Sequence, residues 1–513
     1  MPSPRSAATL YKVCVLLPVL LCCFVSCKDD GEQPTPQTIS ISPNSGLPGA
    51  ATVIQGAQFS ANKGDNVVTF NGKAADIVEA TATQLDVVVP EDADTGPVAV
   101  VVSVKGKVAS SQLIFSVLPA NSTVTSVVPV TGGFNTLVTV TGSDFDATAS
   151  NNVVTFNGIP ALVESGSASS LKVRVPAMAG TGTVVVNSSA PGPVFTYVPD
   201  VYVVGLEFSP AGQRGKYWKN GVAIPWSTPG KNIYFTDIFV VGNDVHISGA
   251  EIKKNGSWVA TYWKNGVSTP LADSIRSTDA RSIDVIGSDV YITGNQTNAS
   301  FKIVAAYWKG GSLKALSEGT YNALTNDIKV VNNDVYVAGE QDTPSGFVAA
   351  KYWKNGTAVV LTPGTAANGT ADGIAIVGSD VYVSGSAQKN LASKYVARYW
   401  KNGIENLLTD GSRNAYTEDI KVVGDDVYVL GYEVNTSGIS VIKYWKNSQE
   451  TVLTDGSREA GAYAFEVIGE DVYVAGFERN GDGKNVAKYW KNGNPIVLAD
   501  GSGNSAAFGI FIQ

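Results

Sequence analysis

Cysteine and histidine are nearly missing from this chain of 513 residues. All four cysteines (Cys14, Cys22, Cys23 and Cys27) lie in the first 27 residues, and His246 is the only histidine. The rest of the chain therefore offers no disulfide, no thiolate nucleophile and no zinc site built from cysteine and histidine. A Ser-His-Asp or Cys-His catalytic pair cannot be assembled from it either.

Charge is also scarce. Asp, Glu, Lys and Arg make up 16% of the residues, and the formal net charge is −8. An acidic chain without a basic cluster is a poor nucleic-acid binder, so we expect no nucleic-acid partner. An apolar content of 44% with 53 glycines suits β-structure with sizeable cores and many turns.

Residues 1–26 are typical of a secretory leader. Arg5 and Lys12 precede an apolar run at 13–25 that is short for a membrane-spanning helix. Residues 24–27, Phe-Val-Ser-Cys, resemble a bacterial lipobox, although Phe24 replaces the usual Leu, Val or Ile. The resemblance implies cleavage before Cys27 and a lipid anchor on its sulfur. An ordinary cleaved leader is the alternative.

The segment after Cys27 is acidic. Residues 28–32, Lys-Asp-Asp-Gly-Glu, resemble the tag that sends lipoproteins of Bacteroidota to the outer face of the outer membrane. On that resemblance we expect a lipid-anchored protein in the outer membrane that faces the cell exterior. The alternative is a solvated linker, and we assign residues 27–37 to a linker in either case.

Two segments repeat at an offset of 86 residues. Residues 67–72 and 153–158 are identical, Val-Val-Thr-Phe-Asn-Gly. Short alternating strands with Asn-Gly turns predict two small β-sandwiches, at 38–118 and 119–199. The Ile-Ser-Pro-Asn-Ser-Gly start at 41–46 and the Phe-Asn-Gly hairpins resemble the IPT/TIG family of immunoglobulin-like domains. The resemblance implies spacer or protein-contact modules, and we interpret them as a stalk.

The remaining chain, 200–513, repeats the pair Tyr-Trp seven times. Successive tryptophans are 45, 45, 45, 47, 45 and 45 residues apart, at Trp218, Trp263, Trp308, Trp353, Trp400, Trp445 and Trp490. One repeat predicts four strands, at 327–331, 335–338, 349–353 and 358–361, with tight turns after the first and the third. Four antiparallel strands per repeat are typical of a propeller blade.

The phase of the repeat predicts how the array closes. Residue 201 begins with the second strand of a repeat, whereas the chain ends with a first strand at 507–513. The sequence therefore predicts an all-β protein in which two sandwiches precede a seven-bladed propeller closed by its C-terminal strand. Alternation along a strand places each Tyr and its following Trp against different neighbouring blades.

The repeat resembles several propeller families. Tyr-Trp is similar to the YWTD repeats of receptor ectodomains, with Lys-Asn in place of Thr-Asp. The string Tyr-Trp-Lys-Asn-Gly followed by Leu-Thr is closer to bacterial HAF-type repeats. Sialidase-type Asp boxes are absent, and none of these resemblances implies an activity.

Binding residues are expected on the face that carries the two longer connections of each repeat, because these vary between repeats. Trp226 and Trp258 are the two tryptophans outside the repeat register, and stacking on a ligand or covering of loop bases both fit them. The candidate binding set comprises Trp226, Trp258, Tyr321, Arg413, Tyr416, Arg458 and Tyr463.

Acidic residues offer a second kind of candidate. Asp237, Asp327 and Asp419 share one position near the start of the first strand and could ligate Ca²⁺. Hydrogen bonding to nearby backbone is the favoured alternative, so we predict no metal and no other cofactor. His246 replaces a repeated Tyr, which makes a packing role the expected one.

Three functions remain open. The first is a monomeric surface lipoprotein whose propeller binds an extracellular glycan or protein, with the sandwiches as its stalk. The second is a polysaccharide-acting hydrolase or lyase on the same face. The third is an adhesion or protein-interaction scaffold. Binding is favoured over catalysis because no catalytic set can be identified.

Overall fold

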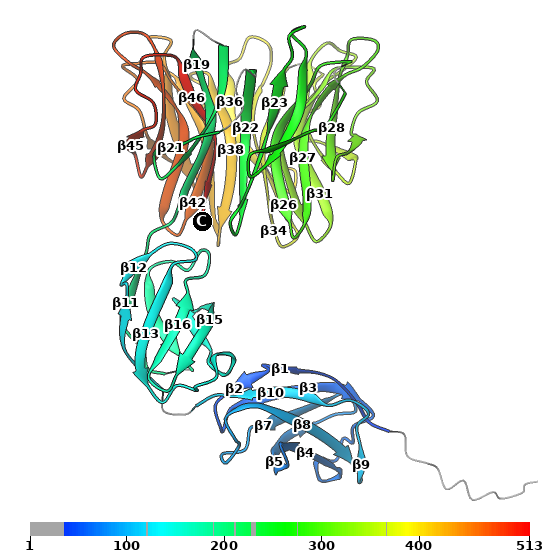
Figure 1. Ribbon diagram of the computed structural model, residues 1–513. Coiled ribbons are helices and arrows are strands. Elements are labelled where there is room, and N and C mark those ends of the chain that lie inside the picture. The colour runs from blue at the N-terminus through cyan, green and yellow to red at the C-terminus, as the bar shows by residue number, and fades with distance from the viewer. Residues whose placement is uncertain are drawn as a thin grey trace, which may run out of the picture. The chain divides into compact units, whose positions relative to one another are not determined.

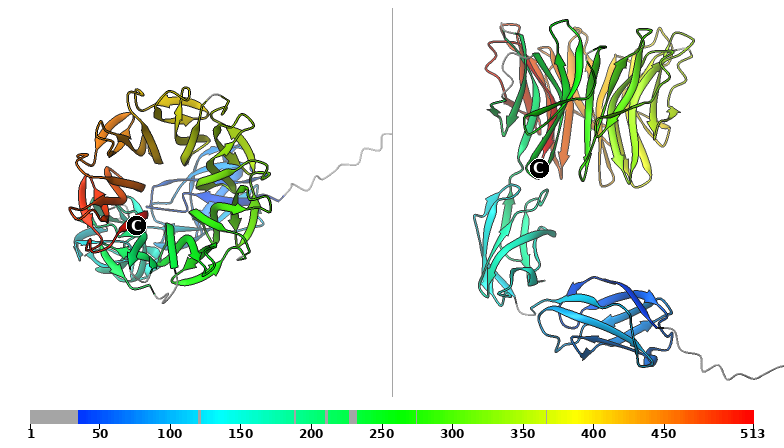
Figure 2. Two further views of the ribbon diagram at one scale, coloured as in Figure 1. Left: turned by 90° about the horizontal axis from the view of Figure 1, so that it is seen from above. Right: turned by 45° about the vertical axis from the view of Figure 1, so that its right-hand side comes forward.

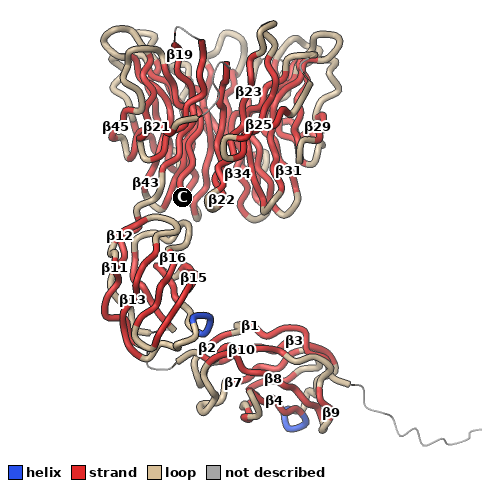
Figure 3. The backbone as a smooth tube through the Cα atoms, in the orientation of Figure 1, coloured by secondary structure: helices blue, strands red, loops and turns tan. Residues whose placement is uncertain are grey.

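The computed structural model describes residues 35–119, 122–187, 189–209, 212–226, 232–273, 275–365 and 367–513 (Figures 1 and 3). Within these ranges the helices are two single turns, η1 (Lys63–Asp65) and η2 (Ala149–Asn151). The predicted all-β class is therefore confirmed. Contacts divide the chain into two units, and the boundary falls between Leu118 and Pro119.

The first unit is built from two sheets. One follows the order β1 (Gln37–Ser42), β3 (Ala51–Ala57), β7 (Gln84–Val88) and β6 (Asp76–Ala80). The other follows the order β2 (Ser45–Gly46), β10 (Leu113–Val117), β8 (Gly96–Val104), β4 (Asn66–Phe70) and β5 (Lys73–Ala74), with β9 (Lys107–Val108) paired to β8.

The second copy repeats this plan at the start of the second unit. Its strands follow the order β11 (Thr123–Val128), β13 (Leu137–Ser143), β16 (Ser170–Arg174), β15 (Ile159–Ser167), β14 (Val154–Phe156), β17 (Gly182–Val186), β18 (Val194–Tyr197) and β12 (Thr131–Gly132). They join into one path because β15 pairs with both β16 and β14. In the first copy the corresponding stretch is divided into β5 and β6.

Each sandwich has its own apolar core. Phe70 and Phe115 meet edge to face at 5.3 Å in the first, and Phe156 and Phe195 do so at 5.0 Å in the second. The residues from alternating strand positions surround these rings and are fully buried. The same alternating pattern in both copies therefore directs the same set of apolar side chains into the core of each sandwich.

Residues 201–512 form seven four-stranded antiparallel sheets, numbered here 1 to 7 along the chain. The innermost strands, from sheet 2 to sheet 7 and then sheet 1, are β22 (Asn232–Val241), β26 (Thr278–Ile286), β30 (Ala323–Val331), β34 (Gly369–Val377), β38 (Ala415–Val423), β42 (Ala460–Ile468) and β46 (Ser505–Ile512). The second strands are β23 (Asp244–Ile252), β27 (Asp289–Thr297), β31 (Asp334–Asp342), β35 (Asp380–Gln388), β39 (Asp426–Val434), β43 (Asp471–Arg479) and β19 (Val201–Ser209).

The outer half of each sheet follows the same order. The third strands are β24 (Trp258–Lys264), β28 (Ile303–Lys309), β32 (Val348–Lys354), β36 (Tyr395–Lys401), β40 (Ser440–Lys446), β44 (Asn485–Lys491) and β20 (Gly212–Lys219). The outermost strands are β25 (Val267–Pro270), β29 (Ser312–Ala315), β33 (Thr357–Val360), β37 (Ile404–Leu407), β41 (Gln449–Val452), β45 (Asn494–Val497) and β21 (Val222–Ile224).

The seven sheets surround a common axis, which Figure 2 shows end on. Each innermost strand contacts the next one, and β22 contacts both β26 and β46, so the series has no open end. Sheet 1 is completed by antiparallel pairing of β46 with β19, from Ser505 opposite Glu207 to Ile512 opposite Val201. The last strand of the chain thus covers an edge that β19 would otherwise expose.

The Tyr-Trp pair packs on both sides of its own sheet, as alternation predicts. Trp218 lies in the core between sheets 1 and 7 beside Tyr473, whereas Tyr217 lies between sheets 1 and 2 beside Phe235. Burial of one such ring stabilises the fold by about 2–3 kcal/mol. The repeated pair therefore belongs to the cores between sheets.

A tight turn follows each pair, and in five of the seven sheets its sequence is Lys-Asn-Gly. In sheet 4, Lys354 Nζ lies 2.9 Å from Asp334 Oδ2 and 5.0 Å from the centre of the Tyr336 ring. Asn355 has φ 53°, and its side chain donates to Asp334 Oδ1 and accepts from the backbone N–H of Val335. These bonds tie the third strand to the start of the second.

The innermost strands are longer than predicted and irregular at one shared position. β30 begins at Ala323, four residues before the predicted start. The first part of the strand was missed because a β-bulge at Asn326 interrupts the alternating sequence pattern. All seven carry this bulge, at Thr236, Arg281, Asn326, Asp372, Glu418, Tyr463 and Phe508.

A glycine in the second strand faces each bulge. A Cβ atom on Gly339 would lie 2.0 Å from the carbonyl oxygen of Leu324, and the equivalent glycines show the same approach. A side chain is therefore excluded at these positions, and the glycine makes the bulge possible.

Gly339→Ala should lower the free energy of unfolding by about 2 kcal/mol or more, because the new methyl group displaces the bulged backbone. Chemical denaturation of both proteins measures this difference. Gly481→Ala is the matched control, since a Cβ there would meet no atom within 4 Å. Equal unfolding midpoints for the two variants would contradict the close contact.

Candidate functional site

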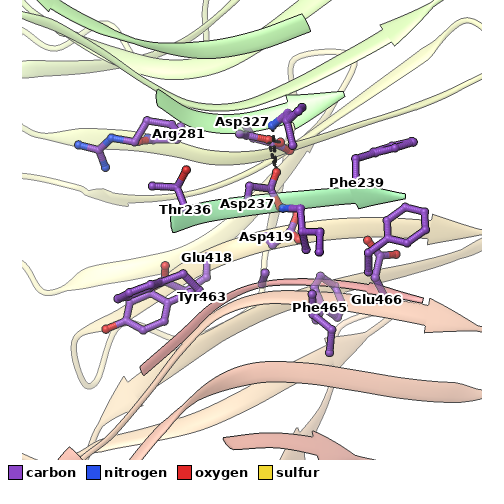
Figure 4. Close-up of a pocket in the computed structure, with 18 of the residues that line it drawn as sticks. Thr236, Asp237, Phe239, Arg281, Asp327, Glu418, Asp419, Tyr463, Phe465 and Glu466 are labelled. Atoms are coloured by element: carbon purple, nitrogen blue, oxygen red, sulfur yellow. Dashed lines mark hydrogen bonds between the residues drawn. The ribbon is translucent and has the colours of Figure 1, made fainter. Parts of the chain in front are cut away.

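A cavity of about 120 Å³ lies on the axis of the ring, and all seven innermost strands line it (Figure 4). The seven bulge residues form the layer nearest to the longer connections, and we call them the mouth layer. Three positions further along the strands lies a lower layer that includes Phe239, Lys329, Lys421, Glu466 and Phe511. The bulges matter because they let consecutive residues, such as Glu418 and Asp419, both line the cavity.

Two aspartates share one serine between these layers. Ser282 Oγ lies 3.0 Å from Asp237 Oδ2 and 2.8 Å from Asp327 Oδ1 (Figure 4). A hydroxyl has a single proton to donate, so one of the two carboxyl groups must carry the second proton. Burial raises the pKa of Asp237 to about 6, and hydrogen bonds from the backbone N–H groups of Ile283 and Ile238 oppose this shift.

The same carboxylates join neighbouring sheets. Asp237 Oδ2 accepts from the backbone N–H of Ile283 at 3.0 Å, and Asp327 Oδ2 accepts from that of Ile374 at 2.9 Å. Each therefore bonds the backbone of the following sheet. Within the described ranges, no group of three or more His, Cys, Asp or Glu could hold a metal ion.

Asp419 has a different partner, although it occupies the equivalent position. Lys421 Nζ lies 3.2 Å from Asp419 Oδ2 and 3.2 Å from Glu466 Oε1. Burial raises the pKa of Asp419 to about 7, although Lys421 lowers it. The lower part of the cavity thus contains paired charges.

Two acids of the mouth layer, Asp372 and Glu418, and the nearby Glu340 on β31 have no such pairing with a cation among the described residues. Burial raises the pKa of Asp372 to about 7, against a hydrogen bond from Thr417 Oγ1 at 2.7 Å. Burial and then Asp372 raise the pKa of Glu340 to about 8, while Asn326 donates to its Oε2. Burial, followed by Asp372 and Asp419, raises the pKa of Glu418 well above its ordinary value. These groups hold protons near neutral pH.

An open groove of about 300 Å³ lies beside the mouth, between sheets 2, 3 and 4. Trp258 forms one wall, and Asp279, Arg281, Asn295 and Gln296 supply polar atoms. Arg281 Nε donates to Asp279 Oδ2 at 2.7 Å, and Asp279 Oδ1 accepts from the backbone N–H of Asn295 at 3.1 Å. The guanidinium is thereby held in one orientation at the groove.

Trp226 is placed differently from Trp258. Its ring packs edge to face against Tyr217 at 5.7 Å and Phe235 at 5.5 Å, at the side of the core between sheets 1 and 2. Of the two explanations for this residue, covering a loop base fits its contacts. Trp258 instead has one ring neighbour, Tyr234 at 5.5 Å, and faces the groove.

Two of the three candidate tyrosines, Tyr416 and Tyr463, lie on the innermost strands β38 and β42. Tyr463 contacts Phe508 at 4.8 Å, and Phe508 contacts Tyr234 at 5.0 Å, which connects Tyr463 to Trp258 through two rings. Tyr416 stacks on Tyr432 at 5.2 Å and meets Tyr395 at 5.0 Å. The structure thus connects Trp258 to Tyr463 through ring contacts, whereas Tyr416 belongs to a separate stack on sheets 5 and 6.

The other candidates lie elsewhere. Tyr321 lines a separate open groove with Glu318 and Gln341, beside sheets 3 and 4. Arg413 pairs with Glu433 at 3.6 Å, and Arg458 is exposed in the connection before β42. These residues do not join the cavity or the groove at Trp258.

His246 has a packing role consistent with its repeat position. It is buried in β23, and its Nδ1 lies 2.7 Å from the hydroxyl of Tyr262. Burial lowers the pKa of the imidazole. The ring therefore replaces the repeated Tyr as a neutral, hydrogen-bonded core group.

Sequence reasoning missed Arg281, Asp372, Glu418 and Glu340. In a regular strand, consecutive residues point to opposite sides. A prediction from simple alternation therefore cannot identify a bulge residue and the residue after it as both facing the cavity. The available signal was the glycine repeated in every second strand, such as Gly339, because a strand glycine marks a bulge or a close backbone approach.

The leader and the lipid-anchor candidate Cys27 lie outside the described residues. Within the described ranges, no helix has the length and apolar character needed to cross a membrane. Anchoring through Cys27 therefore stays a prediction from the sequence.

Comparison with known families identifies the two sandwiches. Residues 36–117 and 122–197 match the model of the IPT/TIG domain. No curated protein matches the chain.

Solved structures show weak similarity. A Bacteroides thetaiotaomicron protein of unknown function is 11% identical with TM-score 0.28, over 81% of this chain and 99% of that chain. An auxiliary nutrient binding protein from the same organism is 11% identical with TM-score 0.21, over 61% and 95%. A surface glycan-binding protein from Prevotella bryantii is 16% identical with TM-score 0.17, over 32% and 42%.

Stability should fall as the pH rises from about pH 5 to about pH 8.5. The folded state keeps protons on Asp372 and Glu340, whose pKa values are about 7 and about 8, whereas the unfolded chain releases them near pH 4. Their contribution to the free energy of unfolding is therefore complete below the unfolded pKa values and is lost as the pH passes the folded ones.

Glu340→Gln should flatten this profile, keeping the melting temperature at high pH about 4 °C or more above that of the unaltered chain. Thermal unfolding at a series of pH values measures it. Glu318→Gln, at an exposed position, is the control and should leave the slope unchanged. If the melting temperature of Glu340→Gln falls with pH as steeply as that of the unaltered chain, the proposed contribution of protonated Glu340 to stability is wrong.

Proposed function

We propose that the ring of seven sheets is a seven-bladed β-propeller at residues 200–513, carried by IPT/TIG-like sandwiches at 38–118 and 119–199. The repeat period, the four strands of each sheet and the pairing of β46 with β19 support this assignment. A signal peptide at 1–26, a lipid on Cys27 and a linker at 27–37 complete the proposed organisation. The sandwiches serve as a stalk.

The propeller binds an extracellular carbohydrate in the groove at Trp258. The observation that carries this proposal is the Trp258 ring in the wall of a groove of about 300 Å³ that also contains Asp279, Arg281, Asn295 and Gln296. An apolar ring face beside a few fixed polar groups suits a sugar, which has apolar C–H faces and a rim of hydroxyls. The protein is placed in the outer membrane, facing the exterior, as a binding protein without a cofactor.

A polysaccharide hydrolase is the second candidate. Glu418 and Asp372 are neighbouring carboxyl groups in the mouth layer, and burial raises both pKa values. A carboxyl group that stays protonated near neutral pH can act as a general acid in glycoside cleavage. An adhesion or protein-interaction scaffold is the third, and absence of carbohydrate binding would favour it.

Trp258→Ala should weaken retention on a bound polysaccharide by about tenfold or more without changing the melting temperature. Affinity gel electrophoresis of the full chain against xylan, galactomannan, starch and polygalacturonate measures retention. Trp226→Ala is the contrasting variant. It should lower the melting temperature, because its ring packs on Tyr217 and Phe235. Undiminished retention by Trp258→Ala would reject the groove.

The hydrolase is tested by release of reducing ends from the same polysaccharides. Release by the unaltered chain, with a loss of about 100-fold or more in Glu418→Gln, would favour catalysis over binding alone. Glu318→Gln is the exposed control. Retention without release would support the binding function.

A further inference from the structure

The aromatic rings at the mouth continue well beyond the groove. From Trp258, ring centres follow at 5.5 Å to Tyr234, 5.0 Å to Phe508 and 4.8 Å to Tyr463. These residues belong to β24, β22, β46 and β42, which lie in sheets 2, 1 and 7. One row of rings therefore crosses the boundaries between three neighbouring sheets.

The row leads towards the Tyr416–Tyr432 stack on sheet 6. Tyr416 is on β38 and Tyr432 is on β39, and both strands contact β42, which carries Tyr463. Burial is the main cause that raises the pKa of Tyr432. Burial and then Glu418 raise the pKa of Tyr463 to about 12. Glu418 is on the same strand as Tyr416 and lines the axial cavity together with Tyr463.

We call the six residues Trp258, Tyr234, Phe508, Tyr463, Tyr432 and Tyr416 the aromatic arc. The rings are partly open, and 37% of the Tyr463 side chain is exposed. The distance between neighbouring ring centres in the row is about the width of one sugar ring. The whole row is therefore longer than one sugar unit and cannot be covered by it. An occupant that uses the whole arc is therefore an extended molecule.

The charges beside the arc decide which extended molecule fits. Arg281 is already matched by Asp279, whereas Asp372, Glu418 and Glu340 have no cation within ion-pair distance among the described residues. Once Asp372 and Glu418 lose their protons, an anionic chain laid across the arc would add negative charge beside them. A neutral chain adds none, and its hydroxyls can both donate to and accept from those groups.

We propose that the aromatic arc binds a neutral polysaccharide chain of several sugar units, with Trp258 at one end and Tyr416 at the other, and that Asp372 and Glu418 exclude polyuronates. This inference rests on the proposed carbohydrate-binding function and extends it from one groove to a line of subsites across sheets 2, 1, 7 and 6. Tyr463 and Tyr416 supply the subsites distant from Trp258.

Affinity gel electrophoresis of the full chain at about pH 8.5 tests the charge preference, since Asp372 and Glu340 have pKa values of about 7 and about 8. The probes are xylan, galactomannan, starch and polygalacturonate. We expect retardation by at least one neutral polymer and none by polygalacturonate. The double variant Asp372→Asn, Glu418→Gln should gain retardation by polygalacturonate. Equal or stronger retardation of the unaltered chain by polygalacturonate would overturn the charge assignment.

Calorimetry with oligosaccharides of two to eight units, taken from the neutral polymer that binds, tests the length of the site. Affinity should keep rising beyond four units. Tyr463→Ala and Tyr416→Ala should each lower the affinity for the longest oligosaccharide by about tenfold. The affinity for the disaccharide should change by about twofold or less. Phe301→Ala is the control, an exposed ring on sheet 3 outside the arc.

The outcomes separate the two proposals. If Trp258→Ala abolishes binding but Tyr463→Ala and Tyr416→Ala leave the longest oligosaccharide unaffected, the groove stands and the arc is overturned. If no polysaccharide retards the unaltered chain, the carbohydrate function itself fails. A melting temperature within about 2 °C of the unaltered chain is required of each variant before its affinity is interpreted.

Discussion

The contact between seven strand glycines and seven bulged carbonyl groups is the constraint on which the axial cavity depends. Gly339 approaches the carbonyl oxygen of Leu324 so closely that no side chain fits. The bulge that this contact permits turns Asn326 and Asp327 to the same side. Without it, the bulge residue and the residue after it could not both face the axis.

Much of the fold could be predicted because its determinants repeat. The Trp spacing gives the number of sheets, and the position of the second strand at residue 201 gives the pairing of β46 with β19. Alternation also predicts that Tyr217 and Trp218 face different cores, as the structure confirms. Periodic patterns of this kind can be read from the sequence alone, so they predict the repeated sheets without any knowledge of tertiary contacts.

The candidate site was less predictable because its residues depart from the repeated sequence pattern. Ser282 stands where three of the other six sheets have Asp, and its role depends on the two carboxyl groups that meet it from sheets 2 and 4. Trp226 and Trp258 are alike in sequence, yet one packs in a core and the other faces a groove. Such differences arise from which side chains converge in space, and single-strand patterns contain no information about that.

The pairing of β46 with β19 has a consequence for how the protein is made. β19 and its partner β46 stand at opposite ends of the seven-sheet region, so the edge of β19 stays unpaired until the other six sheets have been synthesised. Closure of the ring therefore depends on a contact between strands that are far apart in the sequence. A substitution in β46 that weakens this pairing would therefore be expected to act on closure of the whole ring, and not on sheet 1 alone.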